Sequence, residues 1–196
     1  MEEKQGLPVL AFTDPAEWER WLAQHQATAN GLWLKLAKKG ATTATVTYAE
    51  AVDVALCHGW IDGQAGSFDE AFWLQRFTPR GPRSKWSQVN CAKVERLIGA
   101  GRMQPAGLAA VEAARQDGRW DQAYAPSSTA TVPADLQAAL DADPAAAAFF
   151  ATLSSANRYA VLYRVQDAKR PETRARRKHV ERRPGSSFGH GYRSTI

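Results

Sequence analysis

The sequence contains little that is typical of secreted or membrane proteins. It has two cysteines, Cys57 and Cys91, in 196 residues, which is too few for a disulfide-rich secreted domain. No apolar run reaches the roughly 18 to 20 residues that a membrane-spanning helix needs. Residues 1–5 include two acids and lack the basic start of a signal peptide. We therefore expect reduced cysteines, no membrane span and a cytoplasmic location.

Metal-binding patterns are missing as well. The two cysteines lie 34 positions apart, and His25, His179 and His190 are scattered along the chain, so no zinc-ligand spacing occurs. The sequence predicts no metal site and no cofactor.

The composition that is present is that of a globular protein. Hydrophobic residues make up 44% of the chain and charged residues 23%, which excludes a disordered or collagen-like protein. At roughly 100 to 200 residues per domain, the length allows one domain with appendages or two small ones.

The net charge of +5 hides an asymmetry along the chain. Residues 157–196 contain 11 Lys and Arg against three acids, whereas residues 1–156 contain 14 Lys and Arg against 17 acids. Such a basic segment is typical of binding to phosphates, nucleic acid or an anionic membrane surface. The alternative is the solvated face of a surface helix.

Local patterns predict an α+β fold in the first part of the chain. Asp14 and Thr47 each begin a capping box, which predicts a helix start. Alternating apolar residues predict a strand at 32–36, and the aromatic-rich residues 71–77 predict a second strand whose hairpin partner is 62–69. Two further helices are expected, from residue 87 and from residue 105.

The second part of the chain is predicted to be helical throughout. Pro, Ser and Thr dominate residues 126–133, which predicts a linker, and the Gly- and Ser-rich residues 185–196 predict a flexible tail. Proline and serine separate the short helices expected at 135–141, 144–153, 157–169 and 171–183. The predicted domains are an α+β domain at 1–125 and a helical domain at 134–184.

Residues 57–63, Cys-His-Gly-Trp-Ile-Asp-Gly, bring a thiol, an imidazole and a carboxylate close together in the sequence. A nucleophilic Cys-His-Asp site needs these groups, because a base must deprotonate the thiol. Adjacent residues on a helix point about 100° apart, however, so Cys57 and His58 are not expected to meet. We therefore favour a packing role for Cys57 and assign no catalytic residue. An enzyme that uses residues 57–62 remains an alternative.

A second cluster combines basic and aromatic residues in front of a predicted helix. Residues 78–87 lead into that helix, where free backbone N–H groups and basic side chains can converge on an anion. Tryptophan rings could add stacking faces, although the seven tryptophans are equally consistent with a compact aromatic core. The two clusters together predict these ligand-binding residues: His58, Trp60, Asp62, Arg80, Arg83, Lys85 and Trp86.

The third feature is the basic segment at 168–179. Its cations lie on adjoining turns of one helical face, which suits a phosphate backbone, and no aromatic residue is present to stack on bases. We predict weak, sequence-independent binding of polyanions by Lys169, Arg170, Arg174, Arg177 and Lys178. The competing interpretation is that these arginines pair with carboxylates of the first part and hold the two parts together.

From residue 14 to residue 183, the chain resembles the YdeI/OmpD-associated family. The strings that carry the resemblance are 55–63, 77–80, 84–90, 168–174 and 101–108, the last being Gly-Arg-Met-Gln-Pro-Ala-Gly-Leu. The family is also grouped with YjbR/CyaY-like proteins. The resemblance therefore implies an antiparallel sheet flanked by helices, followed by a small all-helical C-terminal domain.

The C-terminal segment of this family carries the label of bacteriocin protection, which implies tolerance of cationic antimicrobial peptides and a porin partner. The lack of a signal peptide argues against the porin association. The resemblance supplies no catalytic residues. We expect an accessory protein, not an enzyme, that binds a small anionic ligand or, as the alternative, nucleic acid without sequence preference.

Overall fold

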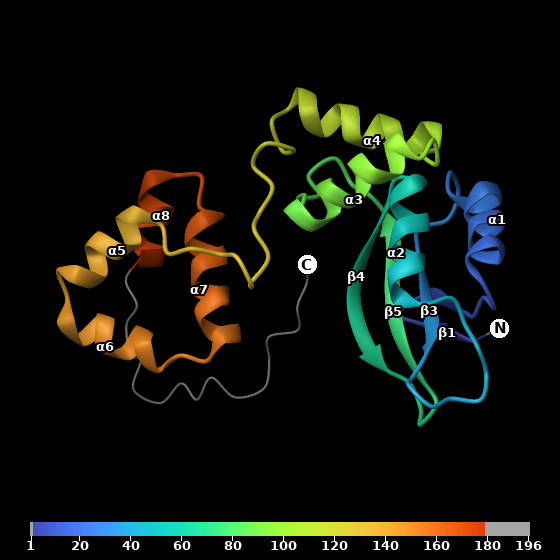
Figure 1. The fold of residues 1–196 in the computed structure, drawn as a ribbon, viewed down its shortest axis with the longest axis horizontal. Helices are drawn as coiled ribbons and strands as arrows, with labels where there is room; N and C mark the ends of the chain where they lie inside the picture. Colours follow the sequence, from blue (N-terminus) through green and yellow to red (C-terminus); the bar gives the residue numbers. More distant parts are fainter. Residues whose placement is uncertain (1, 179–196) are drawn as a thin grey trace. The chain divides into compact units, whose positions relative to one another are not determined.

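The structure is a computed structural model that describes residues 2–178. This part of the chain divides into two compact units, residues 2–123 and residues 124–178, each with its own apolar core (Figure 1). The predicted tail at 185–196, and the predicted end of the last helix near Arg183, lie outside the described residues.

The first unit combines a five-stranded sheet with four helices in its described residues. The strand order is β1-β2-β3-β5-β4, and every pair is antiparallel except β2 with β3, which is parallel. The elements are β1 (Glu3–Lys4), β2 (Leu7–Leu10), α1 (Pro15–His25), β3 (Leu32–Ala37), α2 (Tyr48–Cys57), β4 (Trp60–Ser67), β5 (Phe72–Pro79), α3 (Gln88–Gly99) and α4 (Pro105–Gln116). The predicted fold class is confirmed, with one parallel pairing added to the antiparallel sheet.

The predicted helix starts are confirmed by their capping bonds. The Asp14 side chain accepts a hydrogen bond from the Glu17 backbone N–H at 2.8 Å and caps α1. Thr47 and Glu50 form the predicted capping box at the start of α2. Each bond satisfies an N–H group that has no partner inside the helix.

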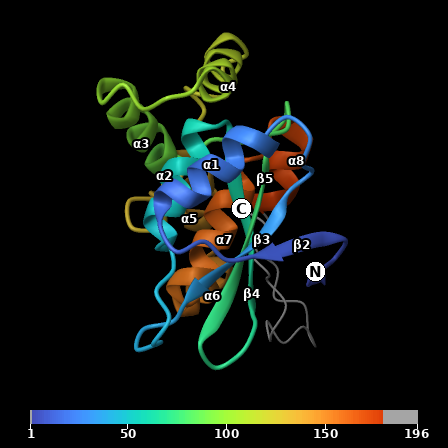
Figure 2. The same cartoon turned by 90° about the vertical axis from the view of Figure 1, so that its right-hand side faces the viewer.

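The two faces of the sheet differ in what covers them. On β3, Leu32 and Leu34 belong to the main core, where they join Trp18 and Leu22 of α1. Helix α2 lies beside α1 and also contacts α3, α4 and β4 (Figure 2). Because side chains alternate along a strand, Trp33 points to the opposite face, where it forms a separate small cluster with Val9 and Leu74.

Helix α4 approaches the end of α2 closely. A Cβ atom on Gly107 would clash with the backbone carbonyl of Cys57, whose carbon would lie 2.8 Å away. The Gln104 N–H also donates to the Cys57 carbonyl at 3.0 Å. Glycine at 107 therefore allows the backbones of two segments to pack directly.

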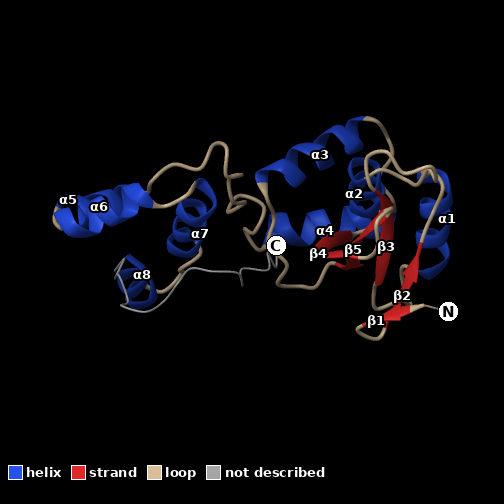
Figure 3. Cartoon of the chain, turned by 90° about the horizontal axis from the view of Figure 1, so that it is seen from below, coloured by secondary structure: helices blue, strands red, loops and turns tan. Residues whose placement is uncertain are grey.

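The second unit consists, in its described residues, of short helices around a small core (Figure 3). The helices are α5 (Ala134–Asp141), α6 (Pro144–Thr152), α7 (Ser155–Gln166) and α8 (Pro171–Lys178). The buried core residues are Leu136, Leu140, Phe150, Leu162 and Val165. None of the helices within residues 2–178 combines the length and the apolar content that crossing a membrane requires.

Candidate functional site

The imidazole of His58 lies inside the first unit, where α2 ends. His58 caps α2 and is 3% exposed. Its Nδ1 lies 2.9 Å from Oε1 of Gln26, and its Nε2 lies 3.9 Å from Oε1 of Glu19. Burial lowers the pKa of His58 below its usual value, although the Glu19 carboxylate acts in the opposite direction. The imidazole is therefore neutral at neutral pH.

The thiol of Cys57 is 1% exposed and belongs to the main core. Burial raises the pKa of this thiol above its usual value, because the thiolate would lose its hydration. A buried, protonated thiol has the properties of a small apolar packing residue. The alternative of an enzyme that uses residues 57–62 stays a prediction.

Trp60 and Asp62 are successive residues of one face of β4, and their surroundings differ. Trp60 is 1% exposed and meets Trp18 and Trp21 edge to face, with centroid distances of 6.3 and 5.9 Å. Asp62 is half-buried, and its Oδ2 accepts a hydrogen bond from the Tyr48 hydroxyl at 2.8 Å. Trp60 is thus a core residue, whereas the Asp62 carboxylate lies near solvent.

Residues 80–86, which we call the basic loop, connect β5 to α3. The guanidinium of Arg80 lies over the Trp86 ring, 3.5 Å from the centroid, and its Nη1 donates to the Lys85 carbonyl at 3.1 Å. A second arginine, Arg119, donates from Nη1 to the Ser84 carbonyl at 2.9 Å. The backbone of the loop is therefore held by two guanidinium groups.

The Trp86 side chain carries an unsatisfied donor. Trp86 is 2% exposed, and its Nε1 has no hydrogen-bond acceptor among the described residues. Arg83 and Lys85 are exposed on the same loop. The loop ends at Ser87, which caps α3, and the first turn of α3 contains no acid. Positive charge and N–H donors thus gather at this helix start.

The two predicted ligand clusters meet through the backbone. The Arg80 N–H donates to the Gly59 carbonyl at 2.9 Å, and Trp60 pairs with Pro79 at the end of the sheet. The side chains of His58 and Trp60 nevertheless lie in the core. A ligand-binding role for the whole predicted set stays a prediction.

The basic residues of α8 are engaged inside the second unit. Arg174 forms two hydrogen bonds of 2.8 Å with the Asp135 carboxylate, and Lys178 lies 3.3 Å from the same carboxylate. These cations hold the pKa of Asp135 well below its usual range. Arg177 donates to the Arg164 carbonyl at 2.6 Å and lies 3.5 Å from the Asp167 carboxylate.

Lys169 and Arg170, the remaining candidates for polyanion binding, are exposed. The bonds of the other candidates tie α8 to α5 and α7, so the carboxylates involved belong to the same helical unit. The competing interpretation had expected them in the first part of the chain.

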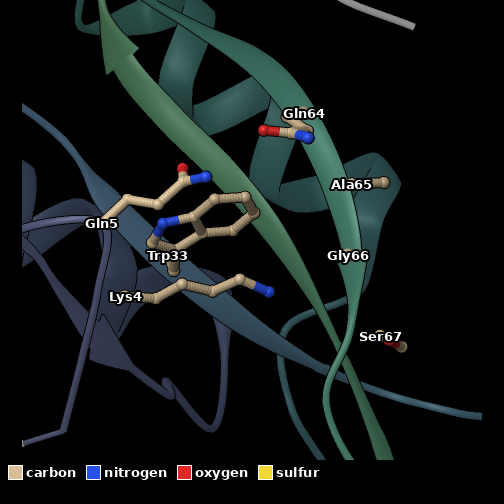
Figure 4. A pocket seen from close by; sticks show the side chains of 7 residues that line it. All are labelled: Lys4, Gln5, Trp33, Gln64, Ala65, Gly66 and Ser67. Carbon is tan, nitrogen blue, oxygen red and sulfur yellow. The ribbon is translucent and has the colours of Figure 1, made fainter. Parts of the chain in front are cut away.

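The structure also contains a hollow that the sequence analysis did not anticipate, on the sheet face that carries Trp33 (Figure 4). Its volume is about 280 Å³, and it is lined by Lys4, Gln5, Trp33 and residues 64–67. Three separate strands or turns contribute to it. The only sequence signal at this place is the Gln5-Gly6 pair, a turn-forming dipeptide between β1 and β2.

Metal-ligating side chains do not gather within residues 2–178, where no group of three His, Cys, Asp or Glu could hold an ion.

Residues 10–110 match the family model described as Domain of unknown function (DUF8412). The chain belongs to the DUF8412 family. The DUF8412 region covers most of the first unit, including the basic loop and the Cys57–Asp62 region.

Residues 129–179 match a second model, described as Bacteriocin-protection, YdeI or OmpD-Associated. This match supports the resemblance to the YdeI/OmpD-associated family, whereas the YjbR/CyaY-like grouping stays a prediction. Neither curated proteins nor solved structures give a match.

Proposed function

We propose that this DUF8412 protein is an accessory protein of the YdeI/OmpD-associated type that binds a small anionic ligand at the basic loop. The observation that carries the proposal is the buried Trp86 indole N–H, which has no acceptor among the described residues and lies in the ring that Arg80 covers. A buried donor without an acceptor costs roughly 1 to 3 kcal/mol, so an anion that accepts from it would recover this energy. The predicted domains at 1–125 and 134–184 and the cytoplasmic location belong to the same proposal.

The electrostatics of the loop agree with this assignment. Arg83 is exposed and next to Ser84, whose carbonyl is already bound by Arg119. The start of α3 adds the partial positive charge of a helix N-terminus, and its first turn offers no carboxylate to compete. An oxyanion here would receive charge-assisted hydrogen bonds, which are the strong ones.

The test is a titration of the full chain with inorganic phosphate, citrate and nucleotides, followed through the tryptophan indole N–H signals in two-dimensional NMR. The Trp86 signal, assigned by its disappearance in Trp86→Phe, should move on addition of at least one anion. Arg83→Ala should weaken that binding about tenfold, because one charge-assisted hydrogen bond is removed. The matched control is Arg20→Ala, an exposed arginine of α1. A Trp86 signal that no anion moves, at millimolar concentration, would overturn the proposal.

The accessory role is tested in cells. We expect a strain without this chain to become more sensitive to cationic antimicrobial peptides or other stress. Wild-type protein should restore tolerance, and Arg83→Ala should restore less of it if the anion site carries the role. Equal rescue by both proteins would separate the cellular role from the basic loop.

A second candidate, polyanion binding by the C-terminal helices, keeps support from one observation. Lys169, Arg170 and Arg176 are exposed, whereas Arg174 and Lys178 share the Asp135 carboxylate. Polyanion binding would then use these exposed cations and not the paired ones.

A further inference from the structure

The hollow on the sheet face that carries Trp33 brings hydrogen-bond donors together from three places in the sequence (Figure 4). Lys4 comes from β1 and Gln5 from the turn that follows it, Trp33 comes from β3, and residues 64–67 come from β4. None of these lining residues is acidic. With a volume of about 280 Å³, the hollow is slightly smaller than typical small-molecule pockets, which measure roughly 300 to 1,000 Å³, so it suits a small ligand.

Trp33 lines this hollow and carries an unsatisfied donor. It is 1% exposed, and its indole Nε1 has no hydrogen-bond acceptor among the described residues. Its cross-strand partner on β5 is Arg76, which the antiparallel register places on the same face of the sheet. The Nε of Arg76 is likewise buried without an acceptor. Two neighbouring N–H donors of this sheet face therefore lack a partner, and one of them belongs to Trp33, which lines the hollow.

Lys4 adds a positive charge. Its Nζ lies 4.7 Å from the centroid of the Trp33 ring, and in Figure 4 the side chain reaches across the hollow toward Gly66. A Cβ atom on Gly66 would lie 2.8 Å from this Nζ, so the ammonium occupies space that any other residue would fill. A cation over an aromatic face keeps its charge, unlike a cation that is neutralised by a carboxylate.

Two amide side chains add uncharged hydrogen-bonding groups to the hollow. Gln5 and Gln64 line the hollow, and an amide side chain both donates and accepts hydrogen bonds, as a hydroxyl group requires. Gln5 has a φ of 54°, a left-handed conformation that is unfavourable for a residue with a side chain. Gly6 follows with a φ of 71°, and positive φ at both central residues is what a type I′ two-residue turn between β1 and β2 requires.

We propose that this hollow is a second binding site, independent of the basic loop, for a small anion that also carries hydroxyl groups. The anionic oxygens, from a carboxylate or a phosphate, would accept from the Lys4 ammonium and the Trp33 indole N–H. The hydroxyl groups would bind the amides of Gln5 and Gln64. Together these interactions satisfy the buried Trp33 donor.

The experiment titrates the full chain with gluconate, glucose 6-phosphate, inorganic phosphate and glucose, and follows the Trp33 indole signal, assigned by its disappearance in Trp33→Phe. Gluconate or glucose 6-phosphate should move the Trp33 signal. Phosphate without hydroxyl-bearing carbon should act more weakly, and uncharged glucose should act least. The comparison of gluconate with glucose 6-phosphate distinguishes a carboxylate from a phosphate ligand.

Three substitutions test the proposed interactions. Lys4→Gln, at the surface, should weaken binding about tenfold or more, since it removes a charge-assisted hydrogen bond. Gly66→Ala should weaken it as well, because the new Cβ displaces the Lys4 ammonium. Trp33→Phe, which keeps a ring but removes the N–H, should weaken binding as measured by calorimetry. The matched control is Lys35→Gln, because Lys35 pairs with Glu2 and lies over Phe68, outside the hollow.

The outcomes separate this inference from the proposed function. Movement of the Trp86 signal without movement of the Trp33 signal would overturn the second site and leave the basic loop intact. Movement of Trp33 alone would support the hollow and contradict the basic loop. Binding of gluconate or glucose 6-phosphate that Lys4→Gln leaves unchanged would also overturn the second site.

Discussion

Cations in the two units of the chain can have very different neighbours. In the first unit, Lys4 lies over the ring of a buried tryptophan, Trp33, whose indole N–H has no acceptor among the described residues. In the second unit, Arg174 and Lys178 converge on one carboxylate, Asp135, which offsets part of their charge. Cations of the more basic segment are thus paired within their own unit, as Lys93 and Arg96 pair with Asp53 in the first unit.

This difference shows that charge density along a sequence does not reveal which cations are paired with carboxylates. A cation available to a ligand needs neighbours that do not neutralise it, and an aromatic face meets this condition. All seven tryptophans lie before residue 121, so the first unit alone offers such faces from indole rings. The same distribution provides a probe, since tryptophan fluorescence reports on the unfolding of the first unit only.

Gly107→Ala should have the largest effect on stability, and it should act on the first unit alone. The new Cβ would clash with the Cys57 backbone, which cannot move aside as a flexible side chain can. We expect a loss of about 3 kcal/mol in the free energy of unfolding. Urea denaturation followed by tryptophan fluorescence measures it. Hydrogen exchange of α5 to α8 should stay unchanged.

Gly99→Ala is the matched control for this prediction. Gly99 also lies in a helix, α3, but a Cβ there would meet nothing within 4 Å. Alanine is the better helix former, so this variant should be neutral or up to about 1 kcal/mol more stable. Equal destabilisation by both substitutions would contradict the close approach of α4 to α2.

Arg174→Glu should have the next largest effect, and it acts on the second unit. It removes both hydrogen bonds to Asp135 and places a carboxylate beside another carboxylate. The pair is partly exposed and screened by solvent, so we expect a loss of about 1 to 2 kcal/mol. Hydrogen exchange in α5 and α8 is the measurement, and tryptophan fluorescence should not change.

Arg176→Glu provides the control, because it makes the same charge change on the same helix at an exposed position. It should leave hydrogen exchange in α5 nearly unchanged. Similar effects of the two reversals would mean that the total charge of α8, and not its bond to Asp135, sets the stability of the second unit.

The sequence predicts the local elements of both units better than the sites that depend on distant residues. The capping residues Asp14 and Thr47 act through bonds within one turn, so their positions in the sequence were sufficient. The strands β1 and β2 were missed because each has few residues, and β2 pairs in parallel with β3. The hollow was missed for a related reason: Lys4, Trp33 and Gly66 meet only after the sheet has formed.

Burial is a second property that the sequence does not show. The predicted ligand residues His58, Trp60 and Trp86 have suitable chemistry, but a sequence does not show which way a side chain points at the end of a helix or strand. In the structure all three are at most 3% exposed. The sequence does not show ion-pair partners either, since the carboxylate that binds Arg174 comes from Asp135, 39 positions earlier.

Acidification should lower the stability of the first unit and not that of the second, and the effect should be smaller than those of the substitutions above. The pKa of buried His58 is lowered, so below the unfolded-state value of about 6.5 the unfolded chain takes up a proton that the folded chain does not. Stability of the first unit should therefore fall as the pH drops below this value, by at most about 1.4 kcal/mol per pH unit. The pKa of Asp135 is lowered as well, but its stabilising effect is lost only below about pH 4.

The measurement is urea denaturation by tryptophan fluorescence at several pH values between 5 and 7, in wild type and in His58→Gln. The variant keeps a group that can bond to Gln26 and does not titrate. It should remove most of the pH dependence in this window. An unchanged pH dependence would mean that another group, and not His58, is responsible. The protection of second-unit amides against hydrogen exchange, after correction for the pH dependence of the intrinsic exchange rate, should stay constant over the same range.

The smallest effect on stability is expected for Lys169→Glu combined with Arg170→Glu. This variant tests whether exposed cations of the second unit bind polyanions. Both residues are exposed, so the change in the free energy of unfolding should stay within about 0.5 kcal/mol. If the second unit nevertheless binds polyanions, these cations must carry the binding, since Arg174 and Lys178 are engaged with Asp135.

Affinity for a DNA duplex, measured by fluorescence anisotropy at two salt concentrations, should then fall in the variant. The salt dependence should become shallower by about 0.9 in log K per log salt for each phosphate that the variant no longer neutralises. Absence of DNA binding in wild type would leave the positive charge of this unit as a structural feature, paired within its own helices, and anion binding as a property of the first unit alone.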